Sequence, residues 1–139
     1  MTWANVSAFI CYLVAALVSI AFGLVYLARS TFMPYHRDAL STSWEQLDKP
    51  LQALLLGLIK VAGGGFLTSG ISVLFMLSFP FRAGESWARF AIPVIALAMA
   101  LPALYSTALV KRRTPANPPV AISRILIALI LLGFVFSMV

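Results

Sequence analysis

Two basic residues, Lys60 and Arg124, stand inside long apolar stretches that hold no Asp or Glu. An ionised side chain among hydrocarbon is costly, so such residues mark functional sites by default. Lys60 lies nine residues after Leu51, which is about 13 Å along a helix. Arg124 lies five residues after Pro119, at the start of the last apolar stretch. If both stretches are helices that cross a membrane, the two cations lie in the same leaflet.

Lys60 and Arg124 allow two interpretations. In the first, they form a basic pocket that holds an anionic head group or a polar quinone-type ring. In the second, their side chains snorkel to lipid phosphates, or they pair with the acidic residues of the preceding connection, namely Asp38, Glu45 and Asp48. The pocket interpretation predicts that Lys60→Ala releases a bound amphiphile.

The segment KVAGGGFLTSG places three consecutive glycines, Gly63, Gly64 and Gly65, shortly after Lys60. Helices in membranes associate through close backbone contact between small residues, and helix packing of this kind explains most of the glycines. Three adjacent glycines point in three directions around a helix, so one interface does not need all of them. The surplus leaves open a ligand beside the helix, such as a lipid chain, a quinone or an isoprenoid.

Tyr105 and His36 are the remaining candidates for polar chemistry. Pro102 frees a backbone carbonyl one turn earlier in its helix, and Tyr105 and Ser106 follow it. We expect the Tyr105 phenol to hydrogen-bond inside the bundle, although a kink followed by hydroxyls would equally suit a small-molecule cavity. His36 is the sole histidine, and we expect it to be a hydrogen-bonding residue at the membrane interface.

Catalytic and metal-binding sets cannot be assembled from this sequence. It lacks a His/Cys/carboxylate cluster for a metal, and it lacks a Ser-His-Asp or Cys-His set, a phosphate-binding loop and a carboxylate within an apolar stretch. We therefore expect no metal and no other cofactor. We also expect the protein to be neither an enzyme nor an ion-coupled transporter.

The composition predicts an all-α integral membrane protein. Of the 139 residues, 62% are hydrophobic and 10% are charged, whereas soluble domains have about 25% charged residues. A spanning helix needs about 20 mostly apolar residues, and four stretches qualify, at about 6–28, 51–79, 88–110 and 119–139. We therefore predict a four-transmembrane-helix bundle that forms one membrane domain over residues 1–139.

The basic residues predict the orientation of this bundle. Six of them lie in or beside the connections 29–50 and 111–118, namely Arg29, Arg37, Lys49, Lys111, Arg112 and Arg113. An excess of Lys and Arg marks the cytoplasmic side, so both termini are expected outside, in the periplasm, and both connections inside. The net charge of +6 then favours anionic lipids at the cytoplasmic face as partners, and not nucleic acid.

The first connection, residues 30–50, is expected to lie along the membrane interface. Thr42-x-x-Glu45 matches a capping box, which predicts a short interfacial helix around Ser43–Leu47. Aromatic and aliphatic side chains would anchor it there, namely Trp44, Tyr35, Phe32 and Leu40.

Small residues at four-residue spacing predict which helix faces pack together. They are Ala15, Ser19 and Gly23 in the first stretch, and Gly57, Gly65 and Ser69 in the second. The simplest architecture that uses them is a bundle whose first and second spans pack most closely.

Several segments carry a resemblance to a known group of proteins. They are GLVYLARSTFMPYHRDAL, Trp44-x-x-Leu47, LLGLIKVAGGGFLTSG and RRTPANPP. Over most of its length the chain resembles small uncharacterised bacterial four-span membrane proteins, which are distantly similar to DoxX-type four-helix bundles. The resemblance implies a bacterial inner-membrane location and the four-helix fold, and it implies no catalytic residue.

The sequence favours the first of two functions and leaves the second as the alternative. The first is an accessory or structural subunit that self-associates or docks onto a larger membrane complex through its small-residue faces. The second is a binding protein for a lipid, quinone or other amphiphile, in a pocket beside the glycine-rich second span. A stable larger assembly would favour the first function, and a stoichiometric bound amphiphile would favour the second.

Overall fold

The computed structural model describes residues 2–139, and in this part of the chain all regular structure is helical. The elements are α1 (Trp3–Ala28), α2 (Pro34–Leu40), the 3-10 turn η1 (Trp44–Gln46), α3 (Lys49–Met76), the π-helical turn η2 (Leu77–Phe81), α4 (Ala88–Arg113) and α5 (Val120–Met138). Four of these helices, counting α3 and η2 as one, are long and apolar enough to cross a membrane. The predicted all-α fold with four long apolar helices is therefore confirmed.

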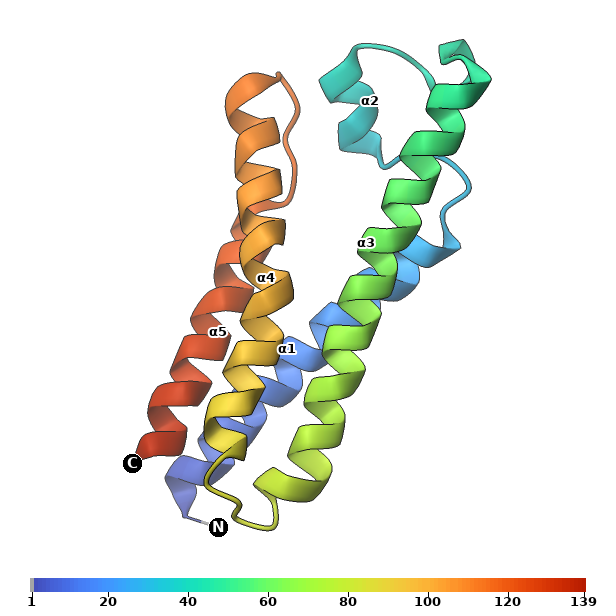
Figure 1. Cartoon of the computed structure of the whole chain (residues 1–139). Coiled ribbons are helices and arrows are strands. Elements are labelled where there is room, and N and C mark those ends of the chain that lie inside the picture. Colours follow the sequence, from blue (N-terminus) through green and yellow to red (C-terminus); the bar gives the residue numbers. More distant parts are fainter. Residues whose placement is uncertain (1) are drawn as a thin grey trace.

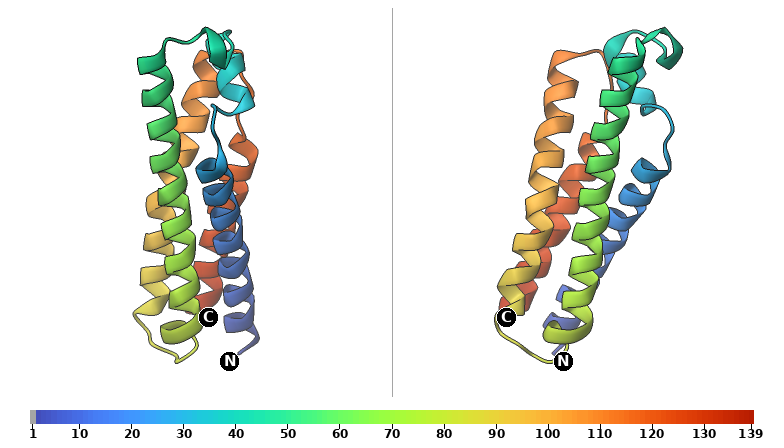
Figure 2. Two further views of the ribbon diagram at one scale, coloured as in Figure 1. Left: turned by 90° about the vertical axis from the view of Figure 1, so that its right-hand side faces the viewer. Right: turned by 45° about the vertical axis from the view of Figure 1, so that its right-hand side comes forward.

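The four long helices form a bundle with both chain ends at one end and α2 at the other (Figure 1). Two further views show the same separation of the termini from α2 (Figure 2). The most extensive helix contact is between α1 and α3, and α5 packs against both α1 and α4. The contact of α3 with α4 is smaller, because these two helices diverge toward the α2 end (Figure 1).

Glycines make the close contact between α1 and α3 possible. A Cβ atom at Gly23 would lie 2.7 Å from the backbone nitrogen of Leu67, and one at Gly63 would lie 2.9 Å from the Cβ of Tyr26. At Gly70 the added atom would lie 2.6 Å from an Ile20 side-chain carbon. Such distances are far below ordinary carbon contacts, so the two backbones approach as closely as they do only because these positions lack side chains.

Two serines tie α3 to its neighbours in the half of the bundle near the termini. The Ser19 hydroxyl on α1 donates to the Phe66 carbonyl at 2.8 Å, and the Ser69 hydroxyl donates to the Ile95 carbonyl on α4 at 3.4 Å. Both serines are buried, as are the predicted packing residues Ala15 and Gly23. Polar contacts and small side chains therefore hold this half of the bundle closed.

Two of the predicted packing glycines, Gly57 and Gly65, do not lie in the contact between α1 and α3. A Cβ atom at Gly57 would meet no other atom within 4 Å, so the expectation that Gly57 packs against another helix of the chain is wrong. At Gly65 the added atom would meet the Met99 sulfur at 3.0 Å, so Gly65 faces α4 and not α1. The regular four-residue spacing fails here because α3 presents different faces to α1 and α4.

The first connection differs from its prediction. Its main helix is α2, seven residues long, and the expected helix around Ser43–Leu47 is only the single turn η1. The cap of η1 lies one residue later than Thr42-x-x-Glu45, because the Ser43 N–H donates to Gln46 Oε1 at 3.2 Å. Pro34 begins α2, where a missing N–H costs nothing.

The aromatic residues of this connection pack mainly on the protein. Phe32 is buried, against the expectation of an interface anchor, and its ring meets that of Trp44 edge-on with centroids 5.3 Å apart. Phe32 and Trp44 form an apolar cluster with Tyr26 and Ile59, which packs the connection against α1 and α3.

Candidate functional site

A cavity of about 510 Å³ lies in the half of the bundle where α3 and α4 diverge. All five α-helices contribute to its wall. Its apolar lining includes Phe22, Leu55, Ile59, Ala62, Phe66, Met99, Ala100, Ala103, Val110 and Leu126. The volume falls in the range of roughly 300–1,000 Å³ that is typical of small-molecule sites.

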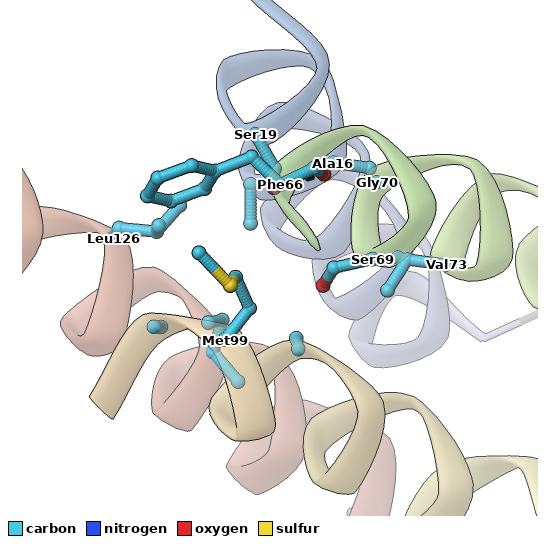
Figure 3. A pocket seen from close by; sticks show the side chains of 12 residues that line it. Ala16, Ser19, Phe66, Ser69, Gly70, Val73, Met99 and Leu126 are labelled. Atoms are coloured by element: carbon cyan, nitrogen blue, oxygen red, sulfur yellow. Dashed lines mark hydrogen bonds between the residues drawn. The ribbon is translucent and has the colours of Figure 1, made fainter. Parts of the chain in front are cut away.

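The floor of the cavity lies near the middle of the bundle. Phe66 from α3, Met99 from α4 and Leu126 from α5 line both the cavity and a void of about 10 Å³ below it. Figure 3 shows these three side chains facing one another on one side of the void, with Ser69 and Val73 on the other side. The space ends here because below this level small side chains bring the helices into contact.

Small side chains on facing helices account for the space above the floor. Ala62 on α3 faces the cavity, as do Ala100 and Ala103 on α4. At the far end α2 contributes Tyr35, His36, Ala39 and Leu40, and so closes part of the opening. The rim residues Leu40, Leu58 and Ile122 are exposed on the outer surface, so the cavity is open to the surroundings of the bundle.

Two aromatic residues and a histidine make the α2 end of the cavity polar. The hydroxyls of Tyr26 on α1 and Tyr35 on α2 share a hydrogen bond of 2.9 Å. The Nδ1 atom of His36 accepts the Met33 N–H at 3.2 Å and so caps α2. Burial lowers the pKa of His36 below its usual 6.5 and raises the pKa of Tyr35 above its usual 10.0, so both rings are neutral at pH 7.

The other hydroxyls on the lining are largely committed to backbone. Thr107 donates to the Ala103 carbonyl at 2.9 Å, and Ser123 donates to the Pro119 carbonyl at 3.4 Å. Ser106 also lines the cavity. The lining contains no Lys, Arg, Asp or Glu among the residues that the structure describes.

Protonation of His36 should loosen α2. The folded state holds His36 with a lowered pKa, so it binds a proton less readily than the unfolded state does. The stabilisation is complete above pH 6.5 and is lost as the pH falls through the folded pKa. We expect the fluorescence of Trp44, measured in a Trp3→Phe, Trp87→Phe background, to change on acidification through this window. His36→Gln, which keeps the capping acceptor, should flatten the profile; an unchanged profile would contradict this role of His36.

Lys60 has a structural partner that neither interpretation from the sequence foresaw. Its ammonium group donates to the backbone carbonyls of Leu27 and Arg29. These groups lie at the C-terminus of α1, where carbonyls lack partners within the helix and a cation is favoured by the helix dipole. Lys60 therefore caps α1, and it does not line the cavity.

Removing this cap should destabilise the protein. Hydrogen bonds to a charged group contribute about 1.5–3 kcal/mol, and because Lys60 is half-buried we expect the lower part of that range for Lys60→Met. Arg124→Met is the matched control, since Arg124 is exposed and its side chain makes no hydrogen bond within residues 2–139. Thermal unfolding in detergent measures both variants. Equal stability of Lys60→Met and the wild type would rule out the cap.

The structure does not bring the predicted ligand-binding residues together. Lys60 lies on α3 with its ammonium group at the end of α1, and Arg124 is exposed on α5. Neither lines the cavity or forms an ion pair with an acid in the described chain. Tyr105 is 70% exposed, so the expectation that it hydrogen-bonds inside the bundle is wrong. Its neighbour Ser106 lines the cavity instead.

The three consecutive glycines each face a different environment. Gly63 faces α1, Gly65 faces Met99 on α4, and a Cβ atom at Gly64 would meet nothing within 4 Å. None of the three lines the cavity. Two of the glycines therefore serve helix packing, and the third lies on the outer surface.

Most of the residues that line the cavity are not marked by any pattern in the sequence. Tyr26 and Ala103 carried no signal, since an isolated tyrosine or alanine in an apolar helix is ordinary. Pro102 and Ser106 were connected with a cavity, and both line it. His36 also lines the cavity.

The fold and the cavity define a class, a helical bundle with four helices of membrane-spanning length around an apolar cavity with a polar end. The chain matches no known family model, no curated protein sequence and no solved structure. The resemblance to DoxX-type bundles therefore stays a prediction. No group of three His, Cys, Asp or Glu side chains is placed to hold a metal ion within the described residues.

Proposed function

We propose that this protein lies in a bacterial inner membrane and binds an amphiphile in the cavity between α2 and the four long helices. The observation that carries the proposal is the cavity of about 510 Å³ with its mostly apolar lining. Pockets with an apolar body and a few convergent polar groups are the usual form of small-molecule sites.

The outer surface supports a membrane location. Large apolar side chains are exposed on every long helix, for example Leu17, Val61, Val94 and Ile125, and Val61 is 74% exposed. Contiguous apolar surface of this extent is unfavourable in water and suits lipid chains. The basic residues near α2 and at the end of α4 favour placing this end of the bundle in the cytoplasm and both termini in the periplasm.

The rim of the cavity would allow a ligand to enter from the lipid. Exposed apolar residues, Leu58 on α3 and Ile122 on α5, form the rim of the cavity. A membrane-dissolved molecule can therefore enter without passing through water.

Native mass spectrometry of the protein extracted from its own membrane in mild detergent tests this function. We expect a discrete added mass of a few hundred daltons or more on each chain, with identical adducts across independent preparations. A bare chain that also takes up no added amphiphile would contradict the proposal.

An exposed face of α3 supports a second candidate function, an accessory subunit of a membrane assembly. Gly57 and Gly64 have no neighbour within 4 Å of an added Cβ atom, and exposed Val61 lies between them. Small residues seven apart on a lipid-facing helix permit close approach of another helix. Gly64→Leu should then dissociate a complex that the wild type forms in the membrane, as seen by crosslinking and blue native electrophoresis.

A further inference from the structure

Building on the amphiphile-binding function proposed above, we propose that the cavity selects an uncharged amphiphile whose head group accepts hydrogen bonds. The head group lies at the α2 end beside His36, and the apolar chain runs toward Phe66 and Met99. The site therefore prefers a carbonyl-type head group over a phosphate, carboxylate or ammonium group.

The lining offers no partner for a charged head group. Within the described residues no Lys, Arg, Asp or Glu lines the cavity. Of the two cations that could have served an anion, Lys60 is used at the end of α1 and Arg124 is exposed outside the lining. A charge buried without a partner is strongly unfavourable, so an ionic head group would remain outside.

The polarity gradient fixes the direction of the ligand. The floor consists of Phe66, Met99 and Leu126, whereas Tyr26, Tyr35 and His36 lie on the lining at the other end. Met99 and Val110 both line the cavity from α4, and their separation of eleven residues corresponds to about 16 Å of helix. This length accommodates an extended alkyl chain below a small head group.

The hydrogen-bonding state of the polar end determines what the head group must offer. The Nδ1 atom of His36 is occupied as an acceptor of the Met33 N–H, so the neutral ring carries its proton on Nε2 as a donor. In the Tyr26–Tyr35 pair one hydroxyl donates to the other, which leaves one phenolic proton free. The Thr107 and Ser123 protons are committed to backbone carbonyls.

A head group at this end therefore meets donors that lack acceptors. His36 Nε2–H has no protein partner in the described chain, and neither does the second phenolic proton. A carbonyl oxygen satisfies such donors, while a purely apolar molecule leaves them unpaired. The cavity should therefore bind a ketone more tightly than an alkane of the same length.

Three probes of matched length test the selectivity: methyl decyl ketone, dodecane and dodecanoate. We measure their binding to the purified full-length protein in detergent micelles by isothermal titration. The wild type is expected to bind the ketone about tenfold more tightly than either dodecane or dodecanoate, which corresponds to one additional hydrogen bond.

Two substitutions at His36 separate head-group recognition from capping of α2. Both Gln and Glu can accept the Met33 N–H as the third residue of a capping box, so both variants should keep α2 folded. His36→Gln retains an N–H donor and should keep the preference for the ketone, whereas His36→Glu has only acceptors at pH 7 and should lose it. Equal binding of ketone and dodecane by the wild type, or a preference that persists in His36→Glu, would overturn the proposed selectivity.

Ala103→Phe distinguishes this selectivity from the underlying function. If the wild type binds dodecane as tightly as the ketone and Ala103→Phe loses both, the cavity binds amphiphiles and only the head-group selectivity fails. If no probe binds the wild type, or Ala103→Phe binds every probe as the wild type does, both proposals fail.

Discussion

Gly63→Ala is expected to lower the free energy of unfolding by about 1–3 kcal/mol, the usual cost of overpacking. The added Cβ atom would lie 2.9 Å from the Cβ of Tyr26 and 3.0 Å from the backbone nitrogen of Leu27. Relief of such contacts requires α1 to move away from α3, because backbone atoms cannot rotate aside. Unfolding in mixed detergent micelles, followed by circular dichroism, measures the loss.

Gly64→Ala is the matched control at the next position of the same helix. Its added Cβ atom would have no neighbour within 4 Å, so it costs no packing, and alanine favours the helix over glycine by up to about 1 kcal/mol. We expect this variant to be as stable as the wild type or slightly more stable. If Gly63→Ala and Gly64→Ala behaved alike, the close crossing of α1 and α3 would be incorrect.

Ala103→Phe is expected to weaken amphiphile binding by about 5-fold to 160-fold, since overpacking a filled site costs about 1–3 kcal/mol. Ala103 lines the cavity from α4, so the added ring occupies space that the ligand needs. The ring also fills an existing cavity, so the fold should retain its stability. Native mass spectrometry would record the loss of adduct.

Val94→Phe provides the control for that substitution. Val94 lies on the same helix, is 68% exposed, and does not line the cavity. Because Val94→Phe enlarges a side chain on the outer surface only, the amphiphile adduct should persist in this variant. Loss of the adduct in Val94→Phe, or its retention in Ala103→Phe, would place the bound molecule outside the cavity.

Much of the fold could be predicted because apolar stretches of spanning length leave little choice of structure. Three of the four long helices extend a few residues beyond the predicted stretches, for example to Phe81 and Arg113. Hydropathy marks the apolar section of a helix, whereas hydrogen bonding continues into polar residues. The structure of the first connection was harder to predict. Its sequence offers a capping-box pattern at Thr42, whereas the structure uses the one at Ser43 and begins α2 at Pro34.

The candidate site was less predictable. Lys60 stood out correctly as unusual, yet its partners are carbonyls of Leu27 and Arg29, and carbonyls leave no trace in a sequence pattern. The surplus of glycines at Gly63–Gly65 was real, but it reflects two interfaces and one outward position. A cavity depends on how far α3 and α4 diverge, and that angle is set by the whole bundle.

The position of a bound alkyl chain tests most directly whether an amphiphile binds in the cavity. Proteoliposomes with an alkyl diazirine probe would be photolysed, and labelled residues mapped by peptide mass spectrometry in the wild type and in Ala103→Phe. Binding in the cavity predicts label on the floor at Phe66 and Met99 in the wild type, and its loss in the variant while lipid-facing Val61 stays labelled. Label confined to outward-facing residues such as Val61 in both proteins would contradict an amphiphile in the cavity.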